Sequence, residues 1–144
     1  MTTQIEDITS KGQLVALRFF QDALAASQTD VQLNALEVAS AAANTVTGFT
    51  MPFPGEVVAV TADTTAAATA GSLAAGATFN GTEGTDTTLT ITTETTKTLK
   101  VLRGSARFAA GAIVGAELTT SGTWDGTTAD LCVTVWVLLQ MEGI

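Results

Sequence analysis

The side chains that most often carry enzyme chemistry are almost absent from this sequence. Its 144 residues contain no His, no Tyr and a single Cys, Cys132. The lack of His removes the commonest general base and metal ligand, and with them Ser-His and Cys-His catalysis. Glu117 and Asp130 could form a catalytic carboxylate pair. Because carboxylates are mostly exposed, we interpret both as strand-edge or turn residues and predict no enzymatic activity.

Loop acids are the remaining candidates for a metal site. Oxygen ligands from Asp125, Asp130, Glu83 and Asp86 would suit a calcium ion. Their spacing is not that of an EF-hand loop, so we interpret them as solvated residues and predict no metal or other cofactor. Cys132 alone can form neither an internal disulfide nor a thiolate zinc site. It is predicted to be an inert buried thiol.

The charge is strongly acidic overall, with one local cluster of cations. Six Lys and Arg oppose fourteen Asp and Glu, which gives a net charge of −8. This balance excludes a general nucleic-acid binder and argues against docking on anionic membranes. Four of the cations fall within one short stretch, and they are Lys97, Lys100, Arg103 and Arg107. They could contact an acidic partner surface, and a solvated hairpin is the alternative.

Two segments hold large apolar side chains that could bind a partner. Residues 14–24 contain Leu14, Leu17, Phe19, Phe20 and Leu24. These side chains could close the domain's own core or pack on a neighbouring subunit. Residues 45–53 contain Phe49 and Phe53, and we predict that the two segments lie close together.

The two tryptophans are further candidates. Trp124 lies in a loop rich in Gly and Thr, where it could be an exposed hot spot for a partner or stack on a sugar. It could instead fold back over one end of the domain, because large aromatic side chains are mostly buried. Trp136 lies within an apolar stretch and is predicted to lie in the core or in an interface between subunits.

The composition predicts strands rather than helices. Thr occurs 28 times and Ala 24 times, and β-branched Thr suits strands whose outer faces carry hydroxyls. Turn signals divide the chain into seven or eight short strand segments, of which the nearly continuous apolar run 131–139 is the strongest, and Asn80-Gly81 is a typical hairpin turn. The sequence therefore predicts an all-β sandwich or barrel.

The N-terminal part is harder to assign. Residues 1–30 are predicted to form an arm or extension, and residues 31–144 the β domain. Within residues 13–26, Leu14, Leu17 and Leu24 follow a helical spacing, whereas Val15, Leu17 and Phe19 alternate as in a strand, so a short helix and a strand both stay open. Residues 39–44 are predicted to form a loop. We find no targeting signal and no apolar span long enough for a membrane.

Four motifs occur in a fixed order along the chain. They are a Met-Pro-x-x-Gly corner before a Val-rich strand (51–60), a Thr-Ala-Gly strand ending in Asn-Gly-Thr (69–82), a Phe-x-Ala-Gly corner (108–115), and Thr-Thr-Ser-Gly followed by a Val-x-Val-Trp-Val strand (119–137). This set resembles the capsid decoration, or cement, proteins of tailed phages, which have a jelly-roll or tulip-like β domain. Ala112 departs from the polar residue expected after the corner.

The resemblance implies a jelly-roll-like sandwich and a non-enzymatic virion protein, assembled in the host cytoplasm and placed on the outer capsid surface. Such a protein binds the major capsid protein as a homotrimer and staples neighbouring capsomers. Stapling adds interface that must break before the shell ruptures. Because one fold hosts many functions, the alternative is a carbohydrate- or receptor-binding module of a phage fibre or spike, which would need an exposed Trp124.

Overall fold

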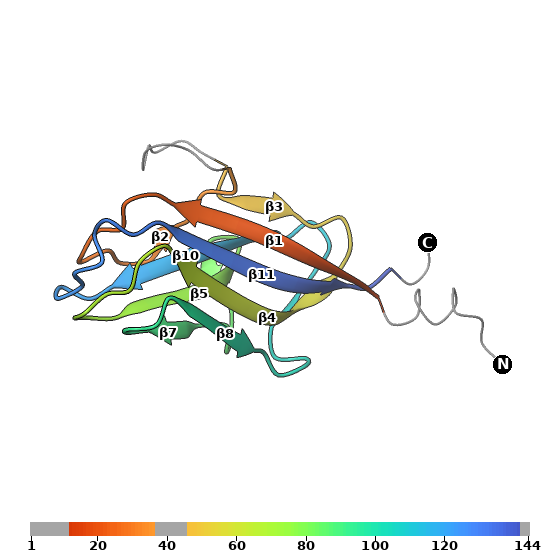
Figure 1. Ribbon diagram of the computed structural model, residues 1–144. Coiled ribbons are helices and arrows are strands. Elements are labelled where there is room, and N and C mark those ends of the chain that lie inside the picture. Colours follow the sequence, from red (N-terminus) through yellow and green to blue (C-terminus); the bar gives the residue numbers. More distant parts are fainter. Residues whose placement is uncertain (1–11, 37–45, 142–144) are drawn as a thin grey trace.

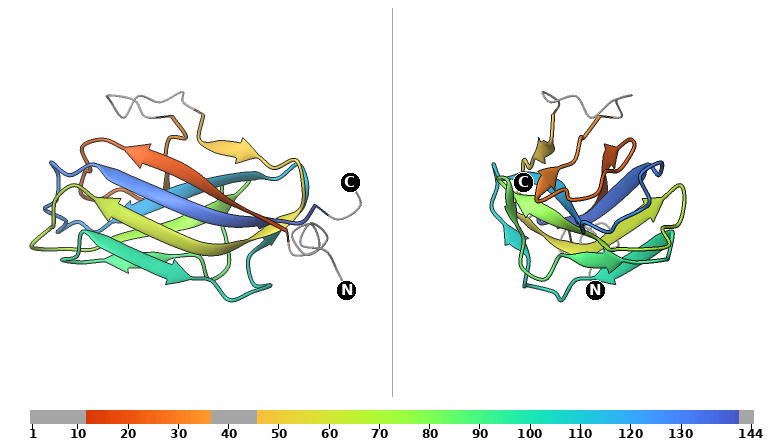
Figure 2. Two further views of the ribbon diagram at one scale, coloured as in Figure 1. Left: turned by 45° about the vertical axis from the view of Figure 1, so that its right-hand side comes forward. Right: turned by 90° about the vertical axis from the view of Figure 1, so that its left-hand side faces the viewer.

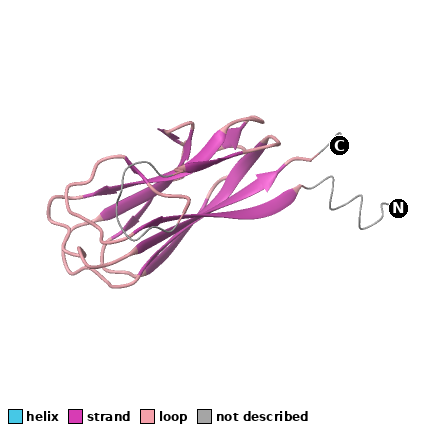
Figure 3. Ribbon diagram, turned by 90° about the horizontal axis from the view of Figure 1, so that it is seen from above, coloured by secondary structure: helices cyan, strands magenta, loops and turns pink. Residues whose placement is uncertain are grey.

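The structure is a computed structural model that describes residues 12–36 and 46–141. Over these two ranges the chain forms eleven strands and no helix (Figure 3), and therefore no helix that could span a bilayer. The strands make two curled antiparallel sheets around one apolar core (Figure 1 and Figure 2). The predicted all-β class is confirmed.

Sheet A holds the longest strands. Its order is β1 (Gln13–Gln21), β11 (Leu131–Leu139), β4 (Gly55–Thr64) and β8 (Thr96–Lys100), and β9 (Arg107–Phe108) also pairs with β4. The pairing of β11 with β4 shifts by one residue at Val58. This bulge leaves Glu56 and Ala59 on the same, outer face of the sheet, because an extra residue resets the alternation of a strand.

Sheet B is built around two central strands. β10 (Ile113–Thr120) pairs with β5 (Leu73–Phe79), and short strands line both edges. The edge of β10 is formed by β2 (Val31–Gln32) and β3 (Gly48–Thr50), and the edge of β5 by β6 (Thr82–Glu83) and β7 (Leu89–Ile91). Each sheet is therefore about four strands wide, although its edges are interrupted.

The core lies between the sheets and follows the alternation of their strands. Val133, Val135 and Val137 of β11 are fully buried, and Ala116 and Leu118 of β10 are fully buried in the facing sheet. Small Val and Ala side chains let the curled sheets approach closely, and each buried Val stabilises the fold by roughly 1.5–3 kcal/mol. Alternate residues on these strands point to the outer faces of the sheets, and those of sheet A carry the surfaces described below.

The N-terminal segment belongs to the sandwich from Gln13 onward, which corrects the predicted arm. β1 pairs with β11 along its whole length, from Gln13↔Leu139 to Gln21↔Leu131. A strand forms instead of the alternative helix because Leu17 and Phe19 alternate into the core while the strand edge satisfies the backbone. Residues 1–11 and the predicted loop at 39–44 lie outside the described residues.

The strand count exceeds the predicted seven or eight for a simple reason. β2 with β3 and β6 with β7 each form one sheet edge in two pieces, as β8 and β9 do along β4. The Asn80-Gly81 turn is confirmed, since both residues have positive φ, 52° and 82°, and Phe79 pairs with Thr82 across them. This is the conformation that a two-residue hairpin of matching twist requires.

Candidate protein-binding surfaces

The outer face of sheet A carries an exposed apolar strip. The register aligns Leu14 of β1 with Leu138 of β11, and the next outward row aligns Ala16 with Trp136 and Ala59. Leu14 is 53% exposed, and Trp136 and Leu138 are half-buried. We call these five residues the apolar strip. It leaves contiguous apolar area in solvent on a part of the sheet that no described element covers.

Two cations flank the apolar strip. Lys100 of β8 pairs with Ala59 and extends the row of Trp136 across the sheet. Arg18 of β1 pairs with Thr134, one row further along the sheet. Both side chains are exposed. A strip of apolar side chains with cations at its margin is typical of a surface that binds a protein with acidic groups at its own margin.

The loop between β8 and β9, residues 101–106, is held in place by a buried carboxylate. Glu56 accepts hydrogen bonds from Arg103 Nε and from the Gly104 N–H, each at 2.6 Å. Burial raises the pKa of Glu56, but these two donors and the charges of Arg103 and Arg107 outweigh burial and keep that pKa below its ordinary value. The loop thereby displays Leu102, which is 76% exposed, next to Arg103.

A cavity of about 290 Å³ opens at the opposite end of sheet A. Phe20, Leu131 and Cys132 supply its apolar wall, and its polar residues are Asp22, Asp63, Thr64, Thr65 and Asp130. Asp63 accepts a hydrogen bond from the Thr96 hydroxyl, and Asp130 accepts one from the Ala23 N–H, both at 2.9 Å. The two ion pairs of the described residues, Arg103–Glu56 and Lys97–Glu94, lie elsewhere. We call this site the acidic cavity.

The structure separates the five apolar residues predicted in segment 14–24. Leu17, Phe19 and Leu24 are buried and close the domain's own core. Their side chains are therefore not available to a partner. Leu14 and Phe20 lie on the outer face, one in the apolar strip and one in the acidic cavity. The difference follows from the period of two along β1.

The predicted proximity of the two segments is confirmed at one contact. The rings of Phe19 and Phe49 lie 5.6 Å apart in a tilted arrangement. Phe49 remains 37% exposed on β3, and Phe53 is half-buried in the corner before β4. Neither residue lies on the apolar strip of sheet A. Phe49 pairs with buried Val114 and so faces the core side of sheet B, whereas exposed Ile113 pairs with Thr50 and faces outward.

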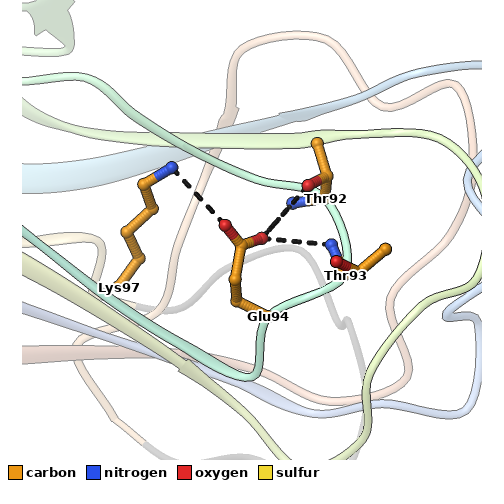
Figure 4. A network of polar contacts seen from close by, with 4 residues as sticks. All are labelled: Thr92, Thr93, Glu94 and Lys97. Atoms are coloured by element: carbon orange, nitrogen blue, oxygen red, sulfur yellow. Dashed lines mark hydrogen bonds and ion pairs between the residues drawn. The ribbon is translucent and has the colours of Figure 1, made fainter.

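The four predicted cations lie on β8, on β9 or in the loop between them, and they differ in their acidic neighbours. Lys100, Arg103 and Arg107 lie along the β8–β9 edge of sheet A, the last two next to Glu56. Lys97 instead forms an ion pair of 3.7 Å with Glu94 in the turn before β8. The turn is closed by hydrogen bonds to Glu94 from the Thr92 and Thr93 N–H groups (Figure 4).

Glu94 is a structural residue of this turn. Its hydrogen bonds, led by the one from the Thr92 N–H, lower the pKa of Glu94 to about 2. The carboxylate therefore stays charged over the whole ordinary pH range and remains able to pair with the Lys97 ammonium group (Figure 4). Lys97 therefore has an acidic partner within the chain, as Arg103 has in Glu56.

Trp124 is a structural residue, so the alternative in which it folds back over the domain is the one observed. Its side chain is only 3% exposed, and a Cβ added at Gly126 would lie 2.7 Å from its ring. Its loop is anchored by Asp125, which accepts hydrogen bonds from the N–H groups of Thr69 and Ala70 at 2.9 and 3.1 Å. A buried Trp124 can neither stack on a sugar nor act as an exposed hot spot.

Among the carboxylates considered for catalysis or calcium, Glu83 and Glu117 lie close enough to interact. In the described ranges no three His, Cys, Asp or Glu side chains are placed to hold a metal ion. Glu117 lies on β10 of sheet B and Asp130 next to β11 of sheet A, so the two are not a pair. Burial and the charges of Asp30 and Glu83 raise the pKa of Glu117, although an amide hydrogen bond from Gln32 opposes the shift.

Sequence reasoning missed the apolar strip and the acidic cavity. Residues 131–139 are nearly all apolar, so the period of two that divides Trp136 and Leu138 from the buried valines is hidden. The bulge at Val58 and the pairing of β1 with β11 are not visible in the sequence either. The one available signal was the hydroxyl at Thr134, which marks the outward positions of β11.

The chain was compared with protein-family models and with curated proteins, and neither comparison found a match. The fold and the surfaces described above are therefore the basis for assigning a function.

Proposed function

We propose that the chain is a non-enzymatic structural protein that binds the outer surface of a phage capsid and stabilises the head, with the major capsid protein as its partner. The observation that carries this proposal is the apolar strip on the outer face of sheet A. Trp136 lies at its centre, between Leu138 and the two flanking cations. Tryptophan and arginine are the residues most enriched among the hot spots of protein interfaces.

We also propose that the sandwich is a jelly roll. When the interrupted edges are each counted once, the chain has eight strand positions, ordered 1-8-3-6 in sheet A and 2-7-4-5 in sheet B. This nested pairing is the strand order expected of a double-sheet jelly roll. It supports the resemblance to capsid decoration proteins on grounds independent of the four sequence motifs.

The mechanism is passive. A capsid surface that covers the apolar strip would remove Leu14, Trp136 and Leu138 from water, and acidic groups on the capsid would pair with Arg18 and Lys100 at its margin. Each copy would add interface that must break before the shell opens. Homotrimers would multiply this effect, because three strips on one particle bind with higher avidity than one.

Cosedimentation tests the proposal. The probe is a preparation of phage heads from the source that encodes the chain, assembled without the chain. We expect saturable binding by the wild type and a loss of roughly thirty-fold or more in affinity for Trp136→Ser. Ile113→Ser is the matched control, since it removes an exposed apolar side chain from sheet B. Absence of wild-type binding, or equal loss in both variants, contradicts the proposal.

The carbohydrate- or receptor-binding alternative predicts a different result. Such a module would bind a glycan array saturably and would not bind heads. Its expected aromatic residue, Trp124, is buried, so no described feature favours this alternative over the capsid proposal.

A further inference from the structure

The loop of residues 101–106 and the acidic cavity lie at opposite ends of sheet A and have complementary properties. Leu102 and Arg103 protrude from the loop, and the side chain of Arg103 is 65% exposed although its Nε binds Glu56. Because Glu56 and the Gly104 N–H fix the loop, a partner would meet an arginine that is already ordered, which reduces the entropy lost on binding.

The acidic cavity suits the end of such a loop. Its apolar wall of Phe20, Leu131 and Cys132 can cover a leucine side chain or the methylene stem of an arginine. Its carboxylates, Asp22, Asp63 and Asp130, can receive a guanidinium group. A cation over the Phe20 ring would add a further attraction. The cavity therefore combines an apolar wall with carboxylates, as an amphipathic cationic side chain requires.

The loop cannot reach the cavity of its own chain. Glu56, which holds the loop, and Asp63, which lines the cavity, are seven residues apart on the same strand, β4. A strand rises about 3.3 Å per residue, so the two sites are separated by roughly 23 Å. Any contact between them must therefore join two chains.

We propose that the loop of residues 101–106 of one copy docks into the acidic cavity of a second copy, with Leu102 against Phe20 and Leu131 and with Arg103 facing Asp22 and Asp63. The inference deepens the proposed function, because it assigns the contact through which the predicted homotrimer forms. A contact between two different patches is heterologous, and successive copies close into a ring when the rotation allows it. The apolar strip stays available to the capsid.

Light scattering on charge variants tests this contact. We expect the wild type to exceed the single-chain mass of 14.7 kDa as concentration rises. Asp63→Lys places a cation in the cavity, and Leu102→Glu places an anion on the loop. Each variant alone should remain at the single-chain mass, with at least a ten-fold weaker association. Added salt should weaken the wild-type association, because exposed charges are screened.

A mixture of the two variants tests directly whether the loop of one copy binds the cavity of another. Asp63→Lys keeps an intact loop and Leu102→Glu an intact cavity, so an equimolar mixture should form a complex of two chains and nothing larger. Glu83→Lys on sheet B and Ala110→Glu in the β9–β10 loop are matched controls that should associate like the wild type. These two control positions are exposed and lie outside both surfaces.

Three results would overturn the inference. They are a wild type that stays at the single-chain mass at every concentration, variants that associate as the wild type does, and a mixture that forms no complex. The proposed function fails by a different result, the absence of binding to heads. Head binding by a chain that stays at the single-chain mass would therefore remove the inference and leave the proposed function in place.

Discussion

At the scale of single residues, two buried glutamates on opposite sheets respond to burial in opposite ways. Glu56 of sheet A receives an N–H and a guanidinium donor at 2.6 Å, so its charged form is favoured despite burial. Glu117 of sheet B receives one amide donor at 3.1 Å and faces the acids Asp30 and Glu83. Its charged form is disfavoured. The same substitution, Glu to Gln, should therefore change stability in opposite directions at the two positions.

Glu117→Gln is expected to stabilise the chain near neutral pH. Because the pKa of Glu117 is raised in the folded chain, its contribution to stability falls as pH rises from about the ordinary value through the raised one. A glutamine keeps the hydrogen bond with Gln32 and carries no charge. We expect a rise in Tm of roughly 3 °C at pH 7 that disappears in acid, measured by thermal melts from pH 4 to pH 8. An unchanged Tm at pH 7 contradicts this account.

Glu56→Gln is expected to do the reverse. The pKa of Glu56 is lowered in the folded chain, so its stabilising effect is present above the ordinary glutamate value and is lost as pH falls through the lowered one. The substitution weakens two charge-assisted hydrogen bonds, at a cost of about 1–3 kcal/mol at pH 7. Urea denaturation at pH 7 and at pH 3 measures the difference. A cost that is equal at both pH values would show that the charge of Glu56 is unimportant.

At the scale of elements, the pairing of β1 with β11 decides which side chains of β1 face the core and which face outward. The alternation along β1 sends Phe19 into the core and Phe20 to the outer face. Sequence alone left this segment open between helix and strand, because Leu14, Leu17 and Leu24 also fit a helix. Pairing with β11, a partner more than a hundred residues away, makes this segment a strand. Local propensity cannot predict such a distant partner.

Neighbouring substitutions on β1 measure that alternation. Phe19→Ala should cost about 3–5 kcal/mol of unfolding free energy, because it leaves a cavity in the core. Phe20→Ala removes the same atoms from a half-exposed position and should cost clearly less. Denaturant titration of the two variants gives the comparison. Equal costs would mean that β1 does not divide its side chains between two faces as described.

Two glycines with nearly equal φ angles separate conformational strain from steric clash. Gly71 and Gly81 have φ of 84° and 82°, but only at Gly71 would a Cβ approach other atoms, 2.5 Å from the Trp124 backbone. Gly81→Ala should cost about 1–2 kcal/mol through the left-handed conformation alone. Gly71→Ala should cost about 1–3 kcal/mol more, as measured by chemical denaturation. Similar costs for the two substitutions would contradict the close contact between Gly71 and the Trp124 backbone.

The longer strands could be located from the sequence because apolar runs and turn residues are local signals. The predicted strand 131–139 coincides with β11, and the Asn80-Gly81 turn closes the β5–β6 hairpin as expected. The β pattern predicted from Val31 onward is present as β2, although that strand has only two residues. The two-residue strands β6 and β9 could not be predicted, since they exist only as edges completed by longer neighbours. The role of Trp124 was likewise undecided, because loop composition does not show which side chains fold back.

At the scale of the whole molecule, charge is divided along the sandwich. Asp22, Asp63 and Asp130 gather at one end of sheet A, and Arg103 and Arg107 lie at the other. The sequence showed the cations as a cluster, because they are close along the chain. The three acids are far apart in sequence and meet only through the pairing of β1, β11 and β4. The apolar strip could not be predicted either, because its residues also come together only through the pairing of these three strands.

The most direct test of the account is hydroxyl-radical footprinting of the chain, free and bound to phage heads prepared without it. We expect oxidation of Trp136 and Leu14 to fall at least several-fold on the heads, because capsid contact covers the apolar strip. Buried Trp124 should react little in either state, and exposed Ile113 should react equally in both. Unchanged oxidation of Trp136 on heads that carry the bound chain would contradict the outer face of sheet A as the docking surface.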